Sequence, residues 1–404
     1  MKKQIILSII ITNFNKAKYL IECLNSITKQ NLYKVEVILI DDNSSDQSKK
    51  ILKKYKDKIQ IIYNKKNLGP SACRNKGIKK ANGLYTVFVD ADDKICASLN
   101  KIKKNILLQK SNSDLILMKY LSTSSDLNNY NFFINEKKIY KKYPTDLFLK
   151  KKINLLNQHE SVWYILFRNN FLKKNKILFL KKSNCLEDLD FVVRSILLSN
   201  NISLLNIKYY FYRELAESLK KNFSIDRTRG ALNVYRSLKS FNKKKLTSIK
   251  KKFLNLRIMF AKNIFFMRYY LLTKKKNFVI NKNINKFAYE IKKNIVKNFS
   301  IKKNDKIAIY CYGPSGKFLF KMLNEMGLRE VIFLDDRLDL VSTIPRTHKI
   351  YKLNKEIAEN YKIIIANPKR FIVSNIKNKN KKVKMLNFNI NDFPMKRDSN
   401  SNSF

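Results

Sequence analysis

The first half of the sequence alternates short apolar runs, rich in β-branched residues, with segments of helical periodicity. This order is typical of a parallel sheet covered by helices, because a parallel strand pair needs a long crossover connection. The predicted strands span residues 5–12, 35–41, 59–63, 84–90 and 115–120. The predicted helices span residues 17–29, 47–55, 71–81 and 161–173, and a further helix begins near Glu187. The pattern predicts an α/β fold for this half.

Carboxylates stand at the carboxyl ends of two predicted strands, where ligands of open α/β sheets bind. Asp41-Asp42 and the run from Asp90 to Asp93 follow these strands, and Glu187-Asp188 opens a later helix. Acids that share a cleft repel each other unless a cation neutralises them, and Mg²⁺ or Mn²⁺ prefers oxygen ligands and also binds diphosphate. Asp90 and Asp92 therefore predict a metal-diphosphate site. An isolated Asp-x-Asp is more often an exposed turn or a helix cap, and this alternative stays open on spacing alone.

Four motifs occur in one order along this half: Ser-Ile-Ile-Ile-Thr-Asn-Phe-Asn-Lys, Ile-Asp-Asp-Asn-Ser-Ser-Asp, Asn-Leu-Gly-Pro-Ser-Ala-Cys-Arg-Asn-Lys-Gly and Val-Asp-Ala-Asp-Asp. The set resembles the family 2 inverting glycosyltransferases of the bacterial surface-polysaccharide type. The resemblance covers about residues 4–215, because residues 164–179, 186–191 and 209–213 also match the acceptor half of such enzymes. It implies a GT-A fold, in which a Rossmann-like sheet binds the nucleotide in its first half.

The resemblance also assigns roles to individual residues. It implies that Asp188 is the catalytic base and that Asp90 and Asp92 hold Mn²⁺ or Mg²⁺, with Asp92 the better candidate for direct coordination. The implied nucleotide-sugar contacts come from Thr12, Asp41, Asp42, Asn67, Arg74 and Asp90. For Arg74 there is an independent reason, since a guanidinium group pairs well with phosphate oxygens.

The implied reaction transfers a sugar from a nucleotide-diphosphate donor, by default a UDP-sugar, to a hydroxyl of a saccharide or lipid-linked acceptor. The setting implied by the resemblance is the synthesis of a surface polysaccharide, capsule or lipooligosaccharide. The sequence admits two alternatives. A nucleotidyltransferase would need a glycine-rich loop after the first strand, where Asn13-Phe-Asn-Lys16 stands instead. A catalytically inactive GT-A protein that binds or scaffolds is the remaining alternative, although the intact Asp90, Asp92 and Asp188 argue against it.

Lysine and arginine total 84 against 31 acidic residues, which gives a formal net charge of +53. The lysines are scattered through every segment, so we interpret the excess as a compositional bias, with an anionic membrane surface as the alternative and no specific nucleic acid as a partner. The five cysteines are far apart and form no C-x-x-C pair, which favours reduced thiols and no zinc site. The first apolar run is read as a buried strand and not as a secretion signal. The expected location is cytoplasmic, with peripheral contact to the inner face of the cytoplasmic membrane left open.

The chain is divided into four predicted regions. Residues 1–225 form the GT-A domain, residues 226–304 a basic helical region, residues 305–392 a small Rossmann-like domain, and residues 393–404 a flexible tail. The aromatic stripe of the basic helices predicts core packing, with a membrane interface as the alternative. Because the turn at residues 312–317 lacks the full glycine pattern, we interpret the C-terminal domain as a degenerate scaffold.

Three further residues are given structural interpretations. His159 and Trp163 lie in the acceptor half, where His159 is read as a structural histidine and Trp163 as a core residue. Glu187 is expected to cap its helix or to position Asp188.

Overall fold

The computed structural model describes residues 4–108, 112–122, 140–156, 161–181, 183–213, 224–275, 289, 301–302, 304–310, 314–328, 330–334, 350–351, 354–365 and 385–387. The chain divides into two compact units. The first contains residues 1–214 and 229–258, and the second contains residues 215–228 and 259–404.

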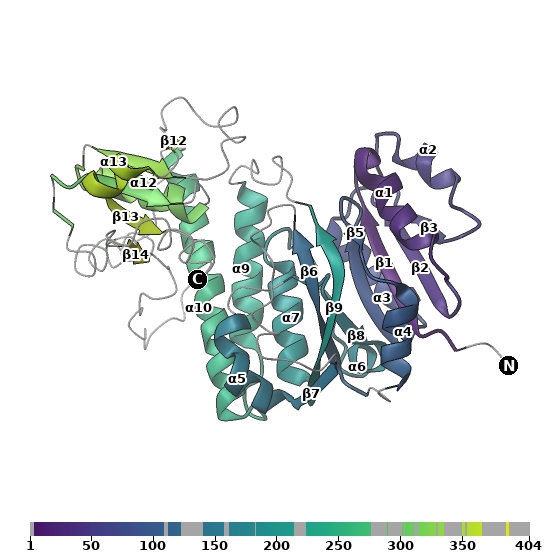
Figure 1. The fold of residues 1–404 in the computed structure, drawn as a ribbon. Helices are drawn as coiled ribbons and strands as arrows, with labels where there is room; N and C mark the ends of the chain where they lie inside the picture. Colours follow the sequence, from purple (N-terminus) through teal and green to yellow (C-terminus); the bar gives the residue numbers. More distant parts are fainter. Residues whose placement is uncertain are drawn as a thin grey trace. The chain divides into compact units, whose positions relative to one another are not determined.

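The described part of the first unit is built on a nine-stranded sheet in the order β3-β2-β1-β4-β8-β6-β9-β5, with β7 paired to β9 (Figure 1). Its strands are β1 (Leu7–Asn13), β2 (Val35–Asp41), β3 (Gln60–Tyr63), β4 (Tyr85–Asp90), β5 (Lys94–Ile95), β6 (Leu115–Ser122), β7 (Tyr140–Pro144), β8 (Ile165–Arg168) and β9 (Asn201–Tyr212). The four strands from β3 to β4 pair in parallel, as the sequence predicts. Beyond β4 the sheet is mixed, because β8 joins it antiparallel to β4 and β6.

Register brings the ends of three strands together. Thr12 of β1 is paired with Ile40 of β2 on one side and with Asp90 of β4 on the other. The last residue of β1, Asn13, is paired with Asp41. The polar residues at these carboxyl ends therefore share one edge of the sheet, which is where open α/β sheets bind ligands.

The helices of this unit are α1 (Ala17–Thr28), α2 (Ser48–Lys53), α3 (Pro70–Lys80), α4 (Leu99–Leu108), α5 (Thr145–Leu156), α6 (Asn169–Lys174), α7 (Glu187–Leu198) and most of α9 (Ile225–Ser240). Helix α3 packs closely on β1 because it carries Gly77. A Cβ on Gly77 would lie 2.4 Å from the side chain of Ile10, so only glycine permits this approach. The same packing brings the preceding turns of α3 to the edge of the sheet.

Four phenylalanines form the core beneath α7. The rings of Phe179 and Phe191 stack with centroids 3.9 Å apart, and Phe88 of β4 and Phe167 of β8 meet Phe191 edge to face. Such aromatic contacts add to the stabilisation from burial. They anchor the helix that begins with Glu187 and Asp188 to the centre of the sheet.

The helix predicted over residues 161–173 is wrong. Residues 165–168 form strand β8, and only residues 169–174 are helical. The run Val162 to Phe167 is buried throughout and rich in aromatic residues, so it satisfies its backbone best as an inner strand between β4 and β6. The other predicted elements of the first unit occur within a few residues of their expected bounds.

The second unit has a smaller sheet in the order β12-β11-β10-β13-β14. Its strands are β10 (Ile307–Tyr310), β11 (Val331–Leu334), β12 (Ile350–Tyr351), β13 (Lys362–Ile365) and β14 (Met385–Asn387), and its helices include α12 (Pro314–Glu325) and α13 (Lys355–Asn360). The second half of α10 (Ser248–Lys275) also belongs to this unit, and its Phe266 and Met267 lie in the unit's hydrophobic core. The aromatic stripe predicted for this helix is therefore core packing.

Two predictions fall wholly or partly outside the described residues. Helix α12 begins at Pro314, so the expected turn at residues 312–317 is helical from that residue, and residues 311–313 are outside the description. The predicted tail, residues 393–404, is also outside it.

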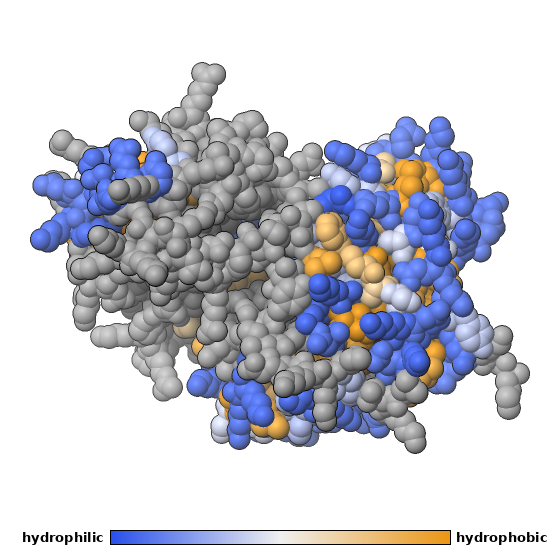
Figure 2. Space-filling view, viewed as in Figure 1, coloured by the Kyte–Doolittle hydropathy of each residue, from blue (hydrophilic) through white to orange (hydrophobic). Residues whose placement is uncertain are grey.

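Hydrophilic side chains cover much of the described surface on the face drawn in Figure 2. Helix α2 alone exposes Lys49, Lys50 and Lys53. In the described part of the chain, no helix combines the length and the apolar composition needed to cross a membrane.

Candidate active site

The site is organised around the side chain of Asp90, the last residue of β4. Its Oδ1 accepts hydrogen bonds from Arg74 at 3.0 Å and from Thr12 at 3.3 Å. The side chain of Asp90 is still 31% exposed, and among the described residues no hydrogen bond or ion pair engages its Oδ2. The second oxygen therefore remains available to a ligand at the edge of the sheet.

Arg74 joins the end of β4 to the beginning of α7. Its Nη2 contacts Asp90, and its Nη1 lies 2.7 Å from Oδ1 of Asp188 and 3.6 Å from Glu187. The residue is only 4% exposed. Burial opposes the charge of Arg74, but the three carboxylates outweigh it and raise the pKa of the guanidinium group. Arg74 thus stays charged and orients two acids that are 98 residues apart in the sequence.

Asp188 lies in the first turn of α7 and is partly buried. Its Oδ2 accepts a long hydrogen bond of 3.3 Å from the backbone N–H of Val162. Burial raises the pKa of Asp188; Arg74 opposes this rise, while the charges of Glu187 and Asp90 add to it. A carboxylate with a raised pKa at the edge of a ligand site is suited to accept a proton near neutral pH.

Asp92 lies two residues beyond Asp90 and pairs with Lys16. The Lys16 Nζ is 2.6 Å from the Asp92 Oδ2, and both side chains are partly exposed. Within the described residues, no group of three or more His, Cys, Asp or Glu side chains is placed to hold a metal ion. Asp90 and Asp92 nevertheless fit a Mg²⁺ or Mn²⁺ ion shared with a diphosphate, since such ions often take only one or two protein carboxylates.

Asp93 stabilises the turn that presents Asp90 and Asp92. The residue is buried, and its carboxylate accepts hydrogen bonds from the Tyr210 hydroxyl and from the Arg213 backbone N–H, both at 2.7 Å. The Tyr210 hydroxyl also accepts a hydrogen bond from the backbone N–H of Asp90 at 3.1 Å. Burial and the charges of Asp90 and Asp92 raise the pKa of Asp93 to about 8. The turn that presents Asp90 and Asp92 is therefore tied to β9.

The predicted nucleotide residues Asp41 and Asp42 are buried and hydrogen-bonded within the protein. Asp41 accepts from Asn13 at 2.7 Å and from the Ser44 hydroxyl at 2.6 Å. Asp42 accepts from the backbone N–H groups of Leu68 at 2.9 Å and Gly69 at 2.7 Å. Both carboxylates therefore stabilise the loops at the edge of the sheet through hydrogen bonds.

The remaining predicted residues fall in different places. Asn67 is exposed in the loop before α3, and Thr12 lies beside Asp90. Trp163 is buried and stacks on Tyr210 with centroids 4.6 Å apart, so it is a core residue as expected. His159 lies outside the described residues.

Sequence reasoning missed Lys16, Asp93, Tyr210 and Arg213 as members of the site. Arg213 donates from Nε to the backbone carbonyl of Asp92 at 2.9 Å, about 120 residues away in sequence. The sequence offered one signal for these residues, the third acid of the run Asp-Ala-Asp-Asp, which is Asp93. A buried acid in such a turn needs hydrogen-bond partners.

The chain is similar to proteins of known family. The model of the family described as glycosyl transferase family 2 matches residues 8–174, which include Thr12, Arg74, Asp90 and Asp92. This part of the chain is similar to the family 2 glycosyl transferases. Asp188 lies beyond the matched residues, in the part of the chain that the fold brings back to the domain.

Two curated relatives illustrate this similarity. The poly(ribitol-phosphate) beta-N-acetylglucosaminyltransferase TarS of Staphylococcus aureus is 30% identical over 217 residues, which is 51% of this chain and 35% of that protein. The cholesterol galactosyltransferase of Borreliella burgdorferi is 27% identical over 293 residues, which is 69% of this chain and 77% of that protein. The chain therefore spans about a third of the length of TarS.

A solved structure supports the fold. The crystal structure of residues 1–349 of S. aureus TarS in complex with UDP-GlcNAc matches with a TM-score of 0.51 at 23% identity. The match covers 65% of this chain and 81% of that one. The predicted GT-A fold around the central sheet is confirmed by this likeness.

Proposed function

We propose that this protein is an inverting glycosyltransferase that moves a sugar from a nucleotide-diphosphate donor to a hydroxyl group. The observation that carries the proposal is the buried Arg74, which holds Asp90 and Asp188 at one edge of the sheet. One acid faces the position expected for the donor diphosphate, and the other is suited to act as a base. The similarity to family 2 and the glycosyltransferases among the relatives support the same activity.

The proposed reaction is a single displacement. The acceptor oxygen forms a bond to the anomeric carbon while the bond from that carbon to the diphosphate oxygen breaks, and Asp188 takes the acceptor proton. The nucleoside diphosphate leaves with the bonding electron pair. Attack opposite to the leaving group inverts the anomeric configuration, so no covalent sugar intermediate on the protein is required.

Arg74 acts in this proposal mainly through the two acids. Its guanidinium group fixes their orientation, and its charge limits the rise in the pKa of Asp188 that burial causes, which favours the ionised form of the base. Two of its nitrogens are occupied by carboxylates, which gives it less freedom to pair with phosphate than the sequence alone suggested.

We propose Asp90 and Asp92 as the residues that hold Mg²⁺ or Mn²⁺ together with the donor diphosphate. The cation would supply positive charge to the leaving group. Asp92 would first have to leave its ion pair with Lys16. The choice of UDP as the donor nucleotide follows the complex of the similar TarS with UDP-GlcNAc.

For the acceptor we propose a saccharide, polyol phosphate or lipid-linked glycan of the cell surface. The relatives include proteins named for poly(ribitol-phosphate) glycosylation and for teichoic acid polymerisation. Capsule and lipooligosaccharide are the other settings to be tested. The proposed location is the cytosol, and contact with the inner face of the membrane is an open alternative.

The deciding experiment measures binding of UDP, GDP and CDP to the purified protein with and without Mn²⁺, and repeats it on Asp92→Ala. We expect metal-dependent binding of one nucleotide, lost in the variant. The nucleotide that binds then selects the sugar donors for transfer assays. If no nucleotide binds in the presence of metal, the chain is a GT-A scaffold without transferase activity.

A further inference from the structure

The position of Asp188 depends on the segment that precedes α7. Leu186, two residues before Asp188, has a φ of 62° and lies in the left-handed region. A branched residue such as leucine adopts this conformation only where the surrounding contacts enforce it. The contacts that hold residues 183–186 therefore decide where α7 begins and where its first turn points.

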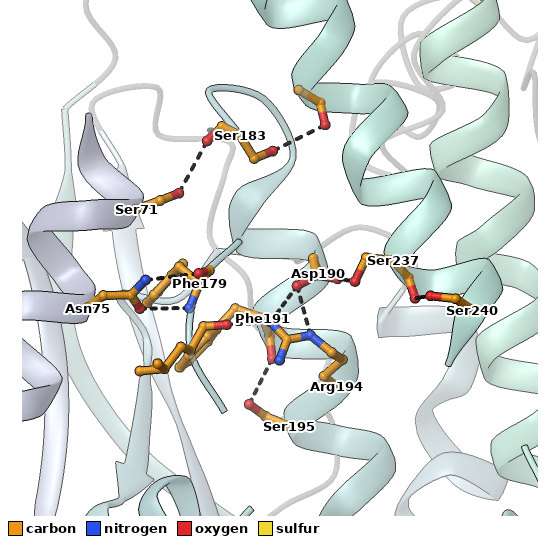
Figure 3. Close-up of polar contacts among 12 residues, drawn as sticks. Ser71, Asn75, Phe179, Ser183, Asp190, Phe191, Arg194, Ser195, Ser237 and Ser240 are labelled. Carbon is orange, nitrogen blue, oxygen red and sulfur yellow. Dashed lines mark hydrogen bonds and ion pairs between the residues drawn. The ribbon is translucent and has the colours of Figure 1, made fainter. Parts of the chain in front are cut away.

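Helix α3 supplies one set of these contacts. Ser71 donates a hydrogen bond to the carbonyl of Ser183 at 3.2 Å, and the Asn75 side chain makes two hydrogen bonds with the backbone of Phe179, at 2.8 and 2.9 Å (Figure 3). Ser71, Arg74 and Asn75 are three and four residues apart, so they share one face of α3. One helix face thus binds both Asp188 and the segment that leads to it.

Helix α9 supplies the second set. The buried Ser183 hydroxyl lies within hydrogen-bonding distance of two carbonyl oxygens, of Gly230 in α9 at 3.2 Å and of Cys185 at 3.1 Å. A Cβ on Gly230 would lie 3.0 Å from the backbone nitrogen of Asn184 and 3.1 Å from that of Cys185. The α9 backbone therefore packs directly on the segment, and a side chain at position 230 would require these backbone atoms to shift by a few tenths of an ångström.

One further hydrogen bond joins α7 itself to α9. Asp190 is fully buried and accepts hydrogen bonds from Ser237 of α9 at 2.6 Å and from the Nε of Arg194 at 2.8 Å (Figure 3). Because Asp190 lies two residues after Asp188 in the same helical turn, this contact limits the rotation of the turn that carries the proposed base.

From these contacts we propose that Gly230 and Ser183 are positioning residues, which hold the first turn of α7 so that Asp188 faces Arg74 and the acceptor. Neither residue contacts the reacting atoms in this scheme. The proposal rests on the proposed function of Asp188. It adds that α9, which lies outside the matched family 2 residues, is a part of the transferase site.

The test compares Gly230→Ala and Ser183→Ala with the control Ser195→Ala. Ser195 is buried in α7, and among the described residues its hydroxyl donates only to the Phe191 carbonyl of its own helix. Alanine is the better helix former, so Gly230→Ala would keep or raise the thermal midpoint if the glycine mattered only to α9 itself. If Gly230 positions Asp188, kcat falls by about tenfold or more while the KM for the donor changes by less than about twofold, since a small displacement of a catalytic group mainly slows the chemical step.

A second measurement keeps this proposal separate from the proposed function. Hydrogen exchange of the backbone amides of residues 183–188 reports how firmly the segment is held, with or without transferase activity. We expect faster exchange there in Gly230→Ala and Ser183→Ala and no change in Ser195→Ala. Unchanged exchange in the two variants would overturn the positioning role. If the wild-type protein transfers sugar, an unchanged kcat in the two variants would overturn it as well. Absence of nucleotide binding in the wild-type protein would instead count against the transferase itself.

Discussion

Arg74 of α3 and Asp188 of α7 form an ion pair with a distance of 2.7 Å between Nη1 and Oδ1. The same guanidinium group also reaches Asp90 at the end of β4. The acids proposed for the donor side and the acceptor side are therefore linked through one guanidinium group. This linkage leads to specific expectations for activity, pH dependence and stability.

Replacing Asp188 by Asn removes the proposed base while keeping its size. We expect kcat to fall by about 10²- to 10⁴-fold, which is the usual contribution of a general base. Metal-dependent binding of UDP should be retained, because Asp188 does not belong to the proposed donor site. Steady-state kinetics and nucleotide titration test both statements, and a variant that keeps more than about half of the wild-type kcat would rule out Asp188 as the base.

Removing the charge of Glu187 tests how the activity depends on the pKa of Asp188. Since the folded protein raises the pKa of Asp188, the base loses activity by protonation at a higher pH than an ordinary aspartate, whose pKa is about 3.9. Glu187→Gln removes a negative charge that contributes to the rise. The acidic limb of the kcat profile should then move to lower pH, and a shift to higher pH would contradict the assignment.

Arg74→Lys keeps the positive charge but cannot bridge two carboxylates with a planar fork of donors. Breaking one side of a buried ion network leaves an acid without its partner, so we expect the free energy of unfolding to fall by about 3 kcal/mol. Activity should fall with it, because Asp90 and Asp188 lose their common support. Urea unfolding and kinetics on the same preparation measure the two effects, and an unchanged unfolding midpoint would show that the network contributes little.

Lys16 competes with a metal ion for Asp92 in the proposed site. Lys16→Met should therefore lower the Mn²⁺ concentration that gives half-maximal nucleotide binding, measured by titration at fixed UDP. Lys94→Met serves as a control, since Lys94 pairs with Glu22 at 2.6 Å and not with Asp92. A higher Mn²⁺ requirement in Lys16→Met would mean that Lys16 assists the donor site more than it competes for the carboxylate. Removal of metal by a chelator should abolish nucleotide binding in all three proteins.

Tyr210→Phe tests the hydrogen bonds that stabilise the turn of Asp90 to Asp93. It removes a hydroxyl that donates to Asp93 and accepts from the Asp90 N–H, so two buried polar groups lose a partner. We expect the free energy of unfolding to fall by about 1–3 kcal/mol. Tyr212→Phe is a suitable comparison, because Tyr212 also stacks on Trp163 but is less buried. Equal losses in both variants would show that the two hydrogen bonds of the Tyr210 hydroxyl contribute no more to stability than the less buried hydroxyl of Tyr212.

The sequence by itself determined the first half of the sheet. Apolar runs with β-branched residues predicted β1, β2, β3 and β4 to within two residues, because buried parallel strands and amphipathic helices have distinct periodicities. It also placed acids at strand ends, since position along a strand determines which edge a residue occupies. The same logic was wrong for residues 161–173, because a short apolar run does not distinguish a buried helix from an inner strand, and the neighbours β4 and β6 decided between them.

Only the tertiary structure decided how the candidate residues are used. Nothing local in the sequence shows that Arg74 meets Asp188, that Tyr210 and Arg213 hold the turn of Asp93, or that Gly230 lies against residues 184–185. These contacts join residues from about 45 to 120 positions apart, and their energy depends on burial and on hydrogen-bond partners that exist only after folding. The residue types alone predicted the kind of chemistry. The orientation and the ionisation of each acid depend on the packed protein around it.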